Sequence, residues 1–146
     1  SLPEKGFSQI IRNKHLMHLS KNAFIFISYE SYLDATIYSK LPFFCSIENI
    51  TKGLRGLRVR GQDSYRVLNR LLGITLDKTK KGQIFGVGVA SSIFYITKIK
   101  KDEFELLIPS SYYVYCHSQI HTIAEHLKNL DRLEIDLGAF FSELRF

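Results

Sequence analysis

Histidines stand at two places in the chain where their spacing could support metal binding. His117, His121 and Glu125 follow one another at intervals of four residues, so a helix would place all three on one face. Two histidines one turn apart can hold a divalent metal, but the H-E-x-x-H context is absent and no third His or Cys ligand is indicated. We interpret this face as the solvated flank of an amphipathic helix. His15 and His18 form a second candidate pair, and we assign a metal to neither pair.

The other reactive side chains also fail to form a catalytic pattern. Cys45 and Cys116 are too few for a disulfide framework or a zinc site, and both lie in apolar stretches. We expect reduced core cysteines, with one disulfide as the alternative. No G-x-S-x-G motif for a nucleophilic serine is present. We interpret the acidic group of Asp131, Glu134 and Asp136 as a solvated face. We therefore assign no catalytic, cofactor-binding or metal-binding residue.

One predicted strand has a face that carries almost no side chains. In the segment 85–90, Gly86, Gly88 and Ala90 alternate with three larger apolar residues. Successive residues of a strand point to opposite faces, so the small residues share one face. We expect a helix or another chain to pack closely there. A flat ligand lying on that face is the alternative.

Arginines are concentrated in one part of a basic chain. Net charge is +6, the pI is about 9.3, and five arginines fall between positions 55 and 70. They are Arg55, Arg58, Arg60, Arg66 and Arg70. No run reaches the five or six like charges of a basic arm, and aromatic residues are not interleaved as single-stranded nucleic acid requires. A salt-bridged subunit contact or a solvated surface fits better, and we expect no nucleic-acid partner.

The chain has the size and composition of one globular domain. It contains 146 residues, 45% of them hydrophobic and 13% aromatic, which is enough to bury a core without disulfides or metal ions. No apolar run reaches the roughly 18 residues of a membrane span, and no signal peptide is visible. We expect a single domain over 1–146, no membrane partner and a cytoplasmic location.

Periodicity predicts the elements that must position these residues. The predicted strands are 23–27, 43–47, 54–60, 84–90, 93–99 and 104–108, with the hairpin turn near Ser91-Ser92. A first helix carries Tyr29, Leu33, Ile37 and Leu41 and stops at Pro42. A second spans about 62–72, with Val67, Leu68, Leu71 and Leu72 inward and Gly73 as the C-cap. A third follows Pro109, with Ser110 or Ser111 as N-cap and an inward stripe of Tyr113, Cys116, Ile120, Ile123, Ala124 and Leu127.

A weak internal repeat suggests how these elements are arranged. Residues 22–27 are similar to residues 102–107, and a Ser-Tyr pair follows each copy, Ser31-Tyr32 and Ser111-Tyr112. The repeat predicts an α+β fold of duplicated strand-helix-strand units, with helices packed on a mostly antiparallel sheet. Chance similarity of two strand-helix units is the alternative.

The order of residues in the middle of the chain resembles a known family. Residues 57–71 are similar to the strand-Gly-helix signature of the folate-binding domain of the glycine cleavage T-protein, a fold that the gamma subunit of sarcosine oxidase shares. In both, an apolar strand ends in Gly, here Gly61, and the next helix carries Val-Leu, here Val67-Leu68. A short stretch then leads to an Asp, here Asp77.

The second half of the chain favours the gamma subunit within that superfamily. Gly82-Gln83, a tight hairpin, the segment 102–108 and then Ser110-Ser111-Tyr112 resemble the gamma pattern of a strand pair, Asp-x-Phe/Tyr-x-Leu and a Ser-led helix. The T-protein pattern has a longer hairpin and an acidic residue toward folate, and neither has a counterpart here. The gamma pattern's Gly-Pro after the first Leu and its Gly-Cys near Leu72-Gly73 are also absent. The resemblance covers residues 19–127.

The resemblance implies a non-catalytic component with no activity alone, docked on the alpha subunit of a sarcosine oxidase that also contains a beta subunit. FAD, FMN, NAD and tetrahydrofolate are then expected on the partner subunits, and none on this chain. The segment 131–146 is a candidate contact tail, through Phe140, Phe141, Leu144 and Phe146. Arg58, Arg60, Arg66 and Arg70 are candidates for an electropositive rim around the contact.

Two other function classes remain open at this point. The first is a stand-alone tetrahydrofolate or pterin binder, which would use the face near Gly86 and Gly88 and an Arg for the glutamate tail. The second is a nucleic-acid accessory protein, whose signature would be loss of binding with rising salt.

Overall fold

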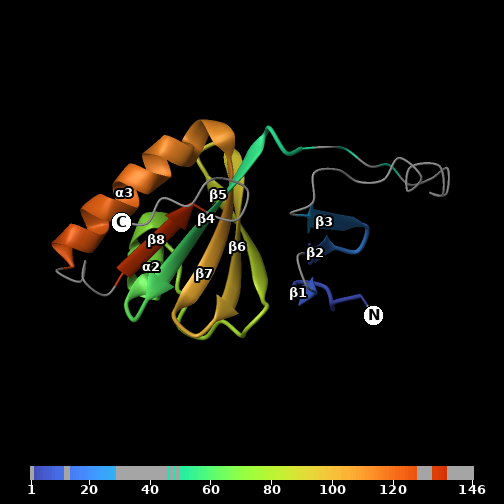
Figure 1. Cartoon of the computed structure of the whole chain (residues 1–146), viewed down its shortest axis with the longest axis horizontal. Coiled ribbons are helices and arrows are strands. Elements are labelled where there is room, and N and C mark those ends of the chain that lie inside the picture. The colour runs from blue at the N-terminus through green and yellow to red at the C-terminus, as the bar shows by residue number, and fades with distance from the viewer. Residues whose placement is uncertain are drawn as a thin grey trace.

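The computed structural model describes residues 2–11, 14–28, 46, 48, 50–127 and 133–137, with the backbone alone at 11 and 133–137. Within these residues the protein is α+β, with two antiparallel sheets and two α-helices (Figure 1). The predicted packing of helices on an antiparallel sheet is confirmed. In the described residues, no helix is both long and apolar enough to cross a membrane.

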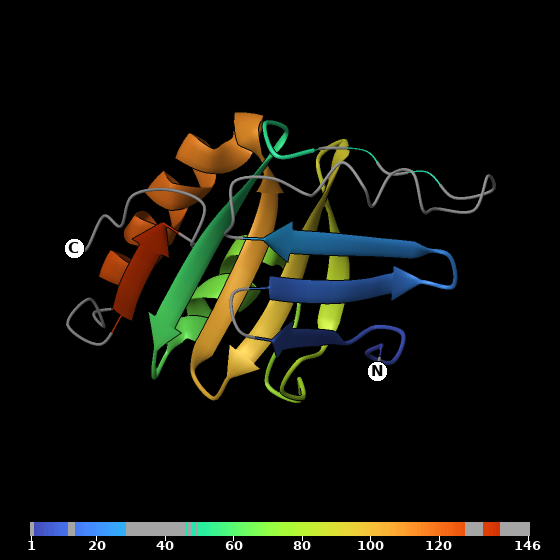
Figure 2. The same ribbon diagram turned by 45° about the vertical axis from the view of Figure 1, so that its right-hand side comes forward.

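The molecule has three layers. Strands β1 (Ser8–Ile11), β2 (Lys14–Ser20) and β3 (Ala23–Ser28) form a small sheet in the order β1-β2-β3. Strands β4 (Leu54–Gly61), β5 (Ile84–Val89), β6 (Ser92–Lys100), β7 (Glu103–Pro109) and β8 (Leu133–Leu137) form the larger sheet, in the order β5-β6-β7-β4-β8. Helices α2 (Ser64–Leu72) and α3 (Tyr113–His126) cover one face of the larger sheet, and the small sheet lies on the other side, its strands running across those beneath (Figure 2).

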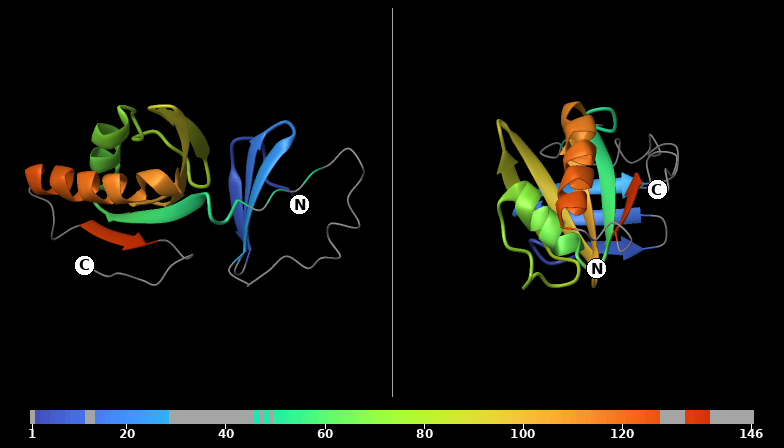
Figure 3. Two further views of the ribbon diagram at one scale, coloured as in Figure 1. Left: turned by 90° about the horizontal axis from the view of Figure 1, so that it is seen from above. Right: turned by 90° about the vertical axis from the view of Figure 1, so that its left-hand side faces the viewer.

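The main core lies between the helices and the larger sheet, as the view from above shows (Figure 3). Alternate strand residues are fully apolar on this side, which is what a face buried by helices requires. The sheet contributes Leu57, Val59, Phe94, Ile96, Phe104, Leu106 and Ile108, and the helices contribute Val67, Leu68, Cys116, Ile120 and Ala124. The predicted inward stripes of both helices are thereby confirmed, since Leu71, Leu72, Tyr113, Ile123 and Leu127 also pack against this core.

The predicted strand-Gly-helix unit and the hairpin are present, with small shifts. Strand β4 ends at Gly61 (φ +136°), and α2 ends at Gly73, whose left-handed φ of 65° makes it the predicted C-cap. The hairpin turn is Ala90-Ser91, one residue earlier than predicted, because Val89 pairs with Ser92. Ala90 takes φ 53°, a left-handed conformation that alanine rarely adopts and that the residue types do not signal.

The predicted N-cap of the third helix is wrong. A 3₁₀ turn, η1 (Ser110–Tyr112), precedes α3, and neither helix start has a side-chain capping bond. The Ser110 hydroxyl instead donates to the carbonyl of Lys52, at 2.8 Å. Ser110 therefore fastens the start of η1 to the segment before β4.

The small sheet was not predicted beyond β3, because its N-terminal strands show no clean period. Gly6 links the two sheets through its backbone: its N–H donates to His18 of β2 at 2.8 Å, and its carbonyl accepts from Ile84 of β5 at 2.7 Å. Phe7 forms a bridge with Gln83 beside these bonds. The N-terminal segment thus ties the small sheet to the start of β5.

Several predictions fall wholly or largely outside the described residues. These are the helix carrying Tyr29, Leu33, Ile37 and Leu41, the strand 43–47, Cys45, and the contact residues Phe140, Phe141, Leu144 and Phe146. Of the repeat, only the strand copies can be compared: β3 belongs to the small sheet and β7 to the larger one. Within the segment 131–146, β8 pairs with β4.

Candidate functional site

The bare face predicted for β5 is present and forms the floor of an open cleft. Gly86 and Gly88 are exposed, and a Cβ placed on Gly88 would meet no described atom within 4 Å. Among the described residues, neither a helix nor a strand packs over Gly88, so the close packing predicted there is not observed within this part of the chain. The face lies open toward the small sheet.

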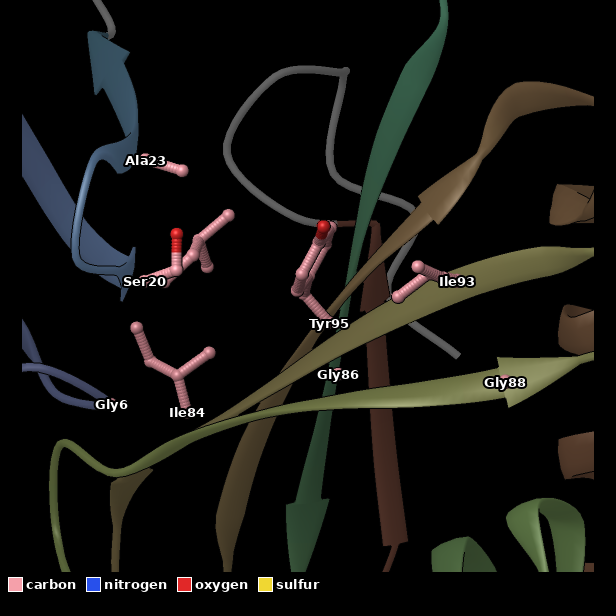
Figure 4. Close-up of a pocket in the computed structure, with 9 residues that line it drawn as sticks. Gly6, Ser20, Ala23, Ile84, Gly86, Gly88, Ile93 and Tyr95 are labelled. Carbon is pink, nitrogen blue, oxygen red and sulfur yellow. The ribbon is translucent and has the colours of Figure 1, made fainter.

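The cleft has a volume of about 500 Å³ and lies between the two sheets (Figure 4). Tyr95 and Ile93 project from β6 beside the glycines, while Ser20 and Ala23 lie across the space from them. The lining is mainly apolar. It comprises Gly6, Leu19, Ser20, Ala23, Ile84, Gly86, Gly88, Ile93 and Tyr95.

The same side of the larger sheet carries a charged network on its central strands. In the register of β4 and β7, Arg58 lies opposite Glu105 and Arg60 opposite Glu103. Arg58 Nη2 donates to Glu105 Oε2 at 2.7 Å, and Arg60 Nε lies 3.5 Å from Glu103 Oε1. Lys100 Nζ lies 3.3 Å from Glu103 Oε2. Glu103 is only 5% exposed and Glu105 only 3%, so each carboxylate depends on neighbouring cations to offset the loss of its hydration.

The small sheet adds a buried histidine to this network. His15 of β2 has no exposed surface, and its Nδ1 lies 3.4 Å from Glu105 Oε1. Met17 and Ile27 of the small sheet pack with Ile84 and Leu107 of the larger sheet beside this pair. Besides the backbone bonds of Gly6, the described contacts between the two sheets thus include an apolar cluster and the buried His15–Glu105 contact.

The electrostatic balance at Glu105 favours its ionised form. Burial alone raises the pKa of this carboxyl, but hydrogen bonds and charge from His15 and Arg58 together outweigh burial and hold the pKa below its usual 4.5. Glu105 thus remains an anion that faces Arg58 and His15 from two different sheets.

The structure separates the four arginines predicted to form one rim. Arg58 and Arg60 lie on the side of the sheet that faces away from the helices, where they pair with glutamates. Arg66 and Arg70 lie on α2, on the opposite side, and Arg66 pairs with Asp63 at 3.3 Å. The four side chains therefore do not gather on one surface. A signal for the Arg-Glu pairs was available, since Arg58 and Arg60 fall on one predicted strand, Glu105 falls on another, and Glu103 directly precedes the second strand.

The candidate histidines lie against other side chains of the fold. The rings of His117 and His121 have centroids 4.8 Å apart and are tilted by 58°, and burial and the neighbouring His121 lower the pKa of His117. The described residues contain no group of three or more His, Cys, Asp or Glu that could hold a metal ion. His15 and His18 do not form a pair: His18 stacks on Phe24 at 4.3 Å, whereas His15 faces Glu105.

Cys116 is a free, buried thiol, as predicted. Burial raises its pKa to about 11, so the reactive thiolate is scarce at neutral pH. A nucleophilic role for Cys116 is therefore disfavoured.

Comparison with known proteins adds no assignment: no protein-family model matches the chain, and no curated protein matches it significantly. The resemblance to the gamma subunit of sarcosine oxidase therefore stays a prediction drawn from the residues themselves.

Proposed function

We propose that this chain is a non-catalytic, gamma-type subunit of a heterotetrameric sarcosine oxidase, which docks on the large flavoprotein subunit and stabilises the complex. The observation that carries the proposal is the succession of elements from β5 to α3. The hairpin β5–β6, the turn at Asp102, strand β7 and the Ser-led turn before α3 follow one another in the order that the resemblance implies.

The strand-Gly-helix motif gives further support, because its residues act as a scaffold. The Asn69 carboxamide accepts from the N–H of Leu76 at 2.8 Å and donates to Asp77 Oδ1 at 3.1 Å. These bonds fold the loop after α2 back onto the helix. The motif Asp is thus used to hold the loop, which suits a subunit whose contribution is a preformed surface.

The positions of the arginines decide which of them can test docking. Arg58 and Arg60 are unsuitable, because reversing their charge would leave buried glutamates unpaired and would damage the fold. Arg66 and Arg70 lie on the outer helix layer, and Arg66 is about half exposed. Arg66→Glu/Arg70→Glu is therefore the informative charge reversal.

The test is co-purification of the tagged full chain from its native host, with mass spectrometry of whatever accompanies it. We expect a large flavoprotein to be recovered, and we expect Arg66→Glu/Arg70→Glu to weaken that recovery while leaving the thermal midpoint unchanged. A chain recovered without any flavoprotein contradicts the proposal.

The cleft favours a second candidate, a stand-alone tetrahydrofolate or pterin binder. Its volume of about 500 Å³, its apolar lining and the ring of Tyr95 suit a flat heterocycle lying over the glycines. The lining residues that the structure describes include no Arg for a glutamate tail. Spectral titration with tetrahydrofolate tests this candidate, with Gly88→Leu as the blocked control. Saturable binding lost in the control supports it, and no spectral change rejects it.

A further inference from the structure

We propose that the outer edge of β5 docks an extended polypeptide segment, which adds to the larger sheet as an extra strand at Gly86 and Gly88. This inference deepens the proposed function and rests on it only for the identity of the partner. The site would recognise backbone amides and apolar side chains, not a charged group or a metal.

The hydrogen bonds at the start of β5 establish which backbone groups face outward. The Gln83 carbonyl accepts from Lys98 of β6 at 3.1 Å, whereas the Ile84 N–H donates away from β6 to Gly6 at 2.7 Å, so along β5 the outward groups belong to even-numbered residues. Because the direction of backbone groups alternates along a strand, the N–H and C=O of Gly86 and Gly88 also point away from β6. No described residue pairs with them.

Strand β5 lacks the features that normally protect an edge. Its sequence, Ile-Phe-Gly-Val-Gly-Val, contains no proline and no charge, and its register with β6 shows no bulge. Glycine at both open positions removes the side chains that would keep another backbone at a distance. An exposed edge of this kind is a template for strand addition.

The chain's own N-terminal segment already pairs with the residues at the start of this edge. Gly6 and Phe7 pair with Ile84 and Gln83 in an antiparallel sense. Continued along β5, that pairing would reach Gly86 and Gly88, but the segment turns away at Gly6, where φ is +80°. The carbonyl of Pro3 lies 3.0 Å from His18 Nδ1, which keeps the segment beside β2. Within the described residues, the backbone groups of Gly86 and Gly88 are therefore available to another strand.

The cleft indicates which side chains the added strand would carry. Residues opposite Gly86 and Gly88 would project over the bare face, where Tyr95, Ile93 and Ile84 supply apolar contacts. A large apolar side chain opposite an edge glycine covers the exposed backbone that the glycine leaves. The occupant is thus an extended segment with apolar residues at alternate positions.

The experiment compares two substitutions at one position. Gly88→Pro removes the outward N–H but preserves the β5–β6 ladder, because that N–H does not face β6. Gly88→Ala keeps the N–H, and its Cβ meets no described atom within 4 Å. The probe is a phage-displayed library of short linear peptides, panned on the full chain. We expect enrichment of peptides with alternate apolar residues, about tenfold or greater loss of affinity in Gly88→Pro, and a change within about threefold in Gly88→Ala.

Amide hydrogen exchange on the wild-type chain keeps the proposal testable if Gly88→Pro fails to fold. An enriched peptide should slow exchange at Gly86 and Gly88 and leave Val87, whose N–H faces β6, unchanged. The proposal is overturned by absence of enriched peptides, by equal binding to Gly88→Pro, or by a β5-to-β5 dimer in sedimentation that Gly88→Pro abolishes. Recovery of a flavoprotein that binds Gly88→Pro normally rejects the edge and leaves the proposed function standing. Peptide binding at the β5 edge without recovery of a flavoprotein supports the edge site and contradicts the proposed function.

Discussion

The two faces of the larger sheet are built from alternate residues of the same strands, yet they are closed by different chemistry. On the helix side, Ile96 and Leu106 are fully buried among apolar neighbours. On the other side, Glu105 meets Arg58 and His15, and Ile93 at the cleft stays 54% exposed. One face is a continuous core, whereas the other combines a small apolar cluster, an ionic contact and open space.

The two faces therefore contribute differently, one mainly to the stability of the fold and the other to the position of the small sheet. Apolar burial stabilises in proportion to area and has no preferred direction, whereas an ion pair requires particular atoms at particular distances. We infer that the helix side supplies most of the free energy of unfolding, while the Glu105 contacts fix where β2 sits on the larger sheet. This positioning leaves the cleft beside it open.

The largest expected effect comes from truncating one isoleucine on the helix side. Ile96→Ala removes a fully buried side chain and should lower the free energy of unfolding by about 3 kcal/mol. Ile93→Ala, on the same strand but facing the cleft, is the matched control and should cost less than about 1 kcal/mol. Urea unfolding monitored by circular dichroism measures both. Equal costs would mean that the two faces do not differ in this way.

Neutralising the central carboxylate should have the next largest effect. Glu105→Gln removes the carboxylate that faces His15 and leaves Arg58 with only Glu103, at 3.6 Å, so we expect a loss of about 2 kcal/mol in the free energy of unfolding. Glu125→Gln, an exposed change on α3, should be close to neutral. If Glu105→Gln is equally neutral in urea unfolding, the ionic contact does not hold the sheets together.

The smallest effect is a change in pH dependence. Because the folded-state pKa of Glu105 is lowered, its stabilisation is present above its unfolded value, near 4.5, and is lost as the pH falls through the folded value. The groups facing Glu105 are Arg58 from β4, His15 from β2 and, by register, Thr97 from β6. The difference in unfolding free energy between wild type and Glu105→Gln should therefore shrink as the pH falls below the unfolded-state pKa of about 4.5. A difference that stays constant over this range would assign the stabilisation to packing.

Much of the helix side could be predicted from sequence, because a buried face leaves a regular period. The stripe through Cys116, Ile120 and Ala124, and the alternation at Leu57 and Val59, gave the elements and their inward faces correctly. The predicted position of the β5–β6 turn was off by one residue, because Ala90 occupies a left-handed turn position that its residue type does not signal.

The other side could not be predicted in the same way, because its partners are distant in sequence and only partly apolar. Strand β2 buries His15 and Met17 while Leu16 lies on its opposite side, so hydrophobicity shows no alternation. The burial of His15 makes sense only once Glu105 is known to face it. The cleft itself was indicated through Gly86 and Gly88, but its depth depends on where the small sheet lies.

The backbone bonds between Gly6 and Ile84 also have a consequence for the timing of synthesis. About 80 residues of chain separate the two partners, so the ribosome needs roughly 4–16 seconds to deliver the second after the first. During that interval the three N-terminal strands have neither the start of β5 nor Glu105 to dock on, and a sheet this small buries too little apolar surface alone to offset the entropy of ordering it. The strands of the small sheet are thus made before the residues on which they dock, and they can settle only after those residues have been made.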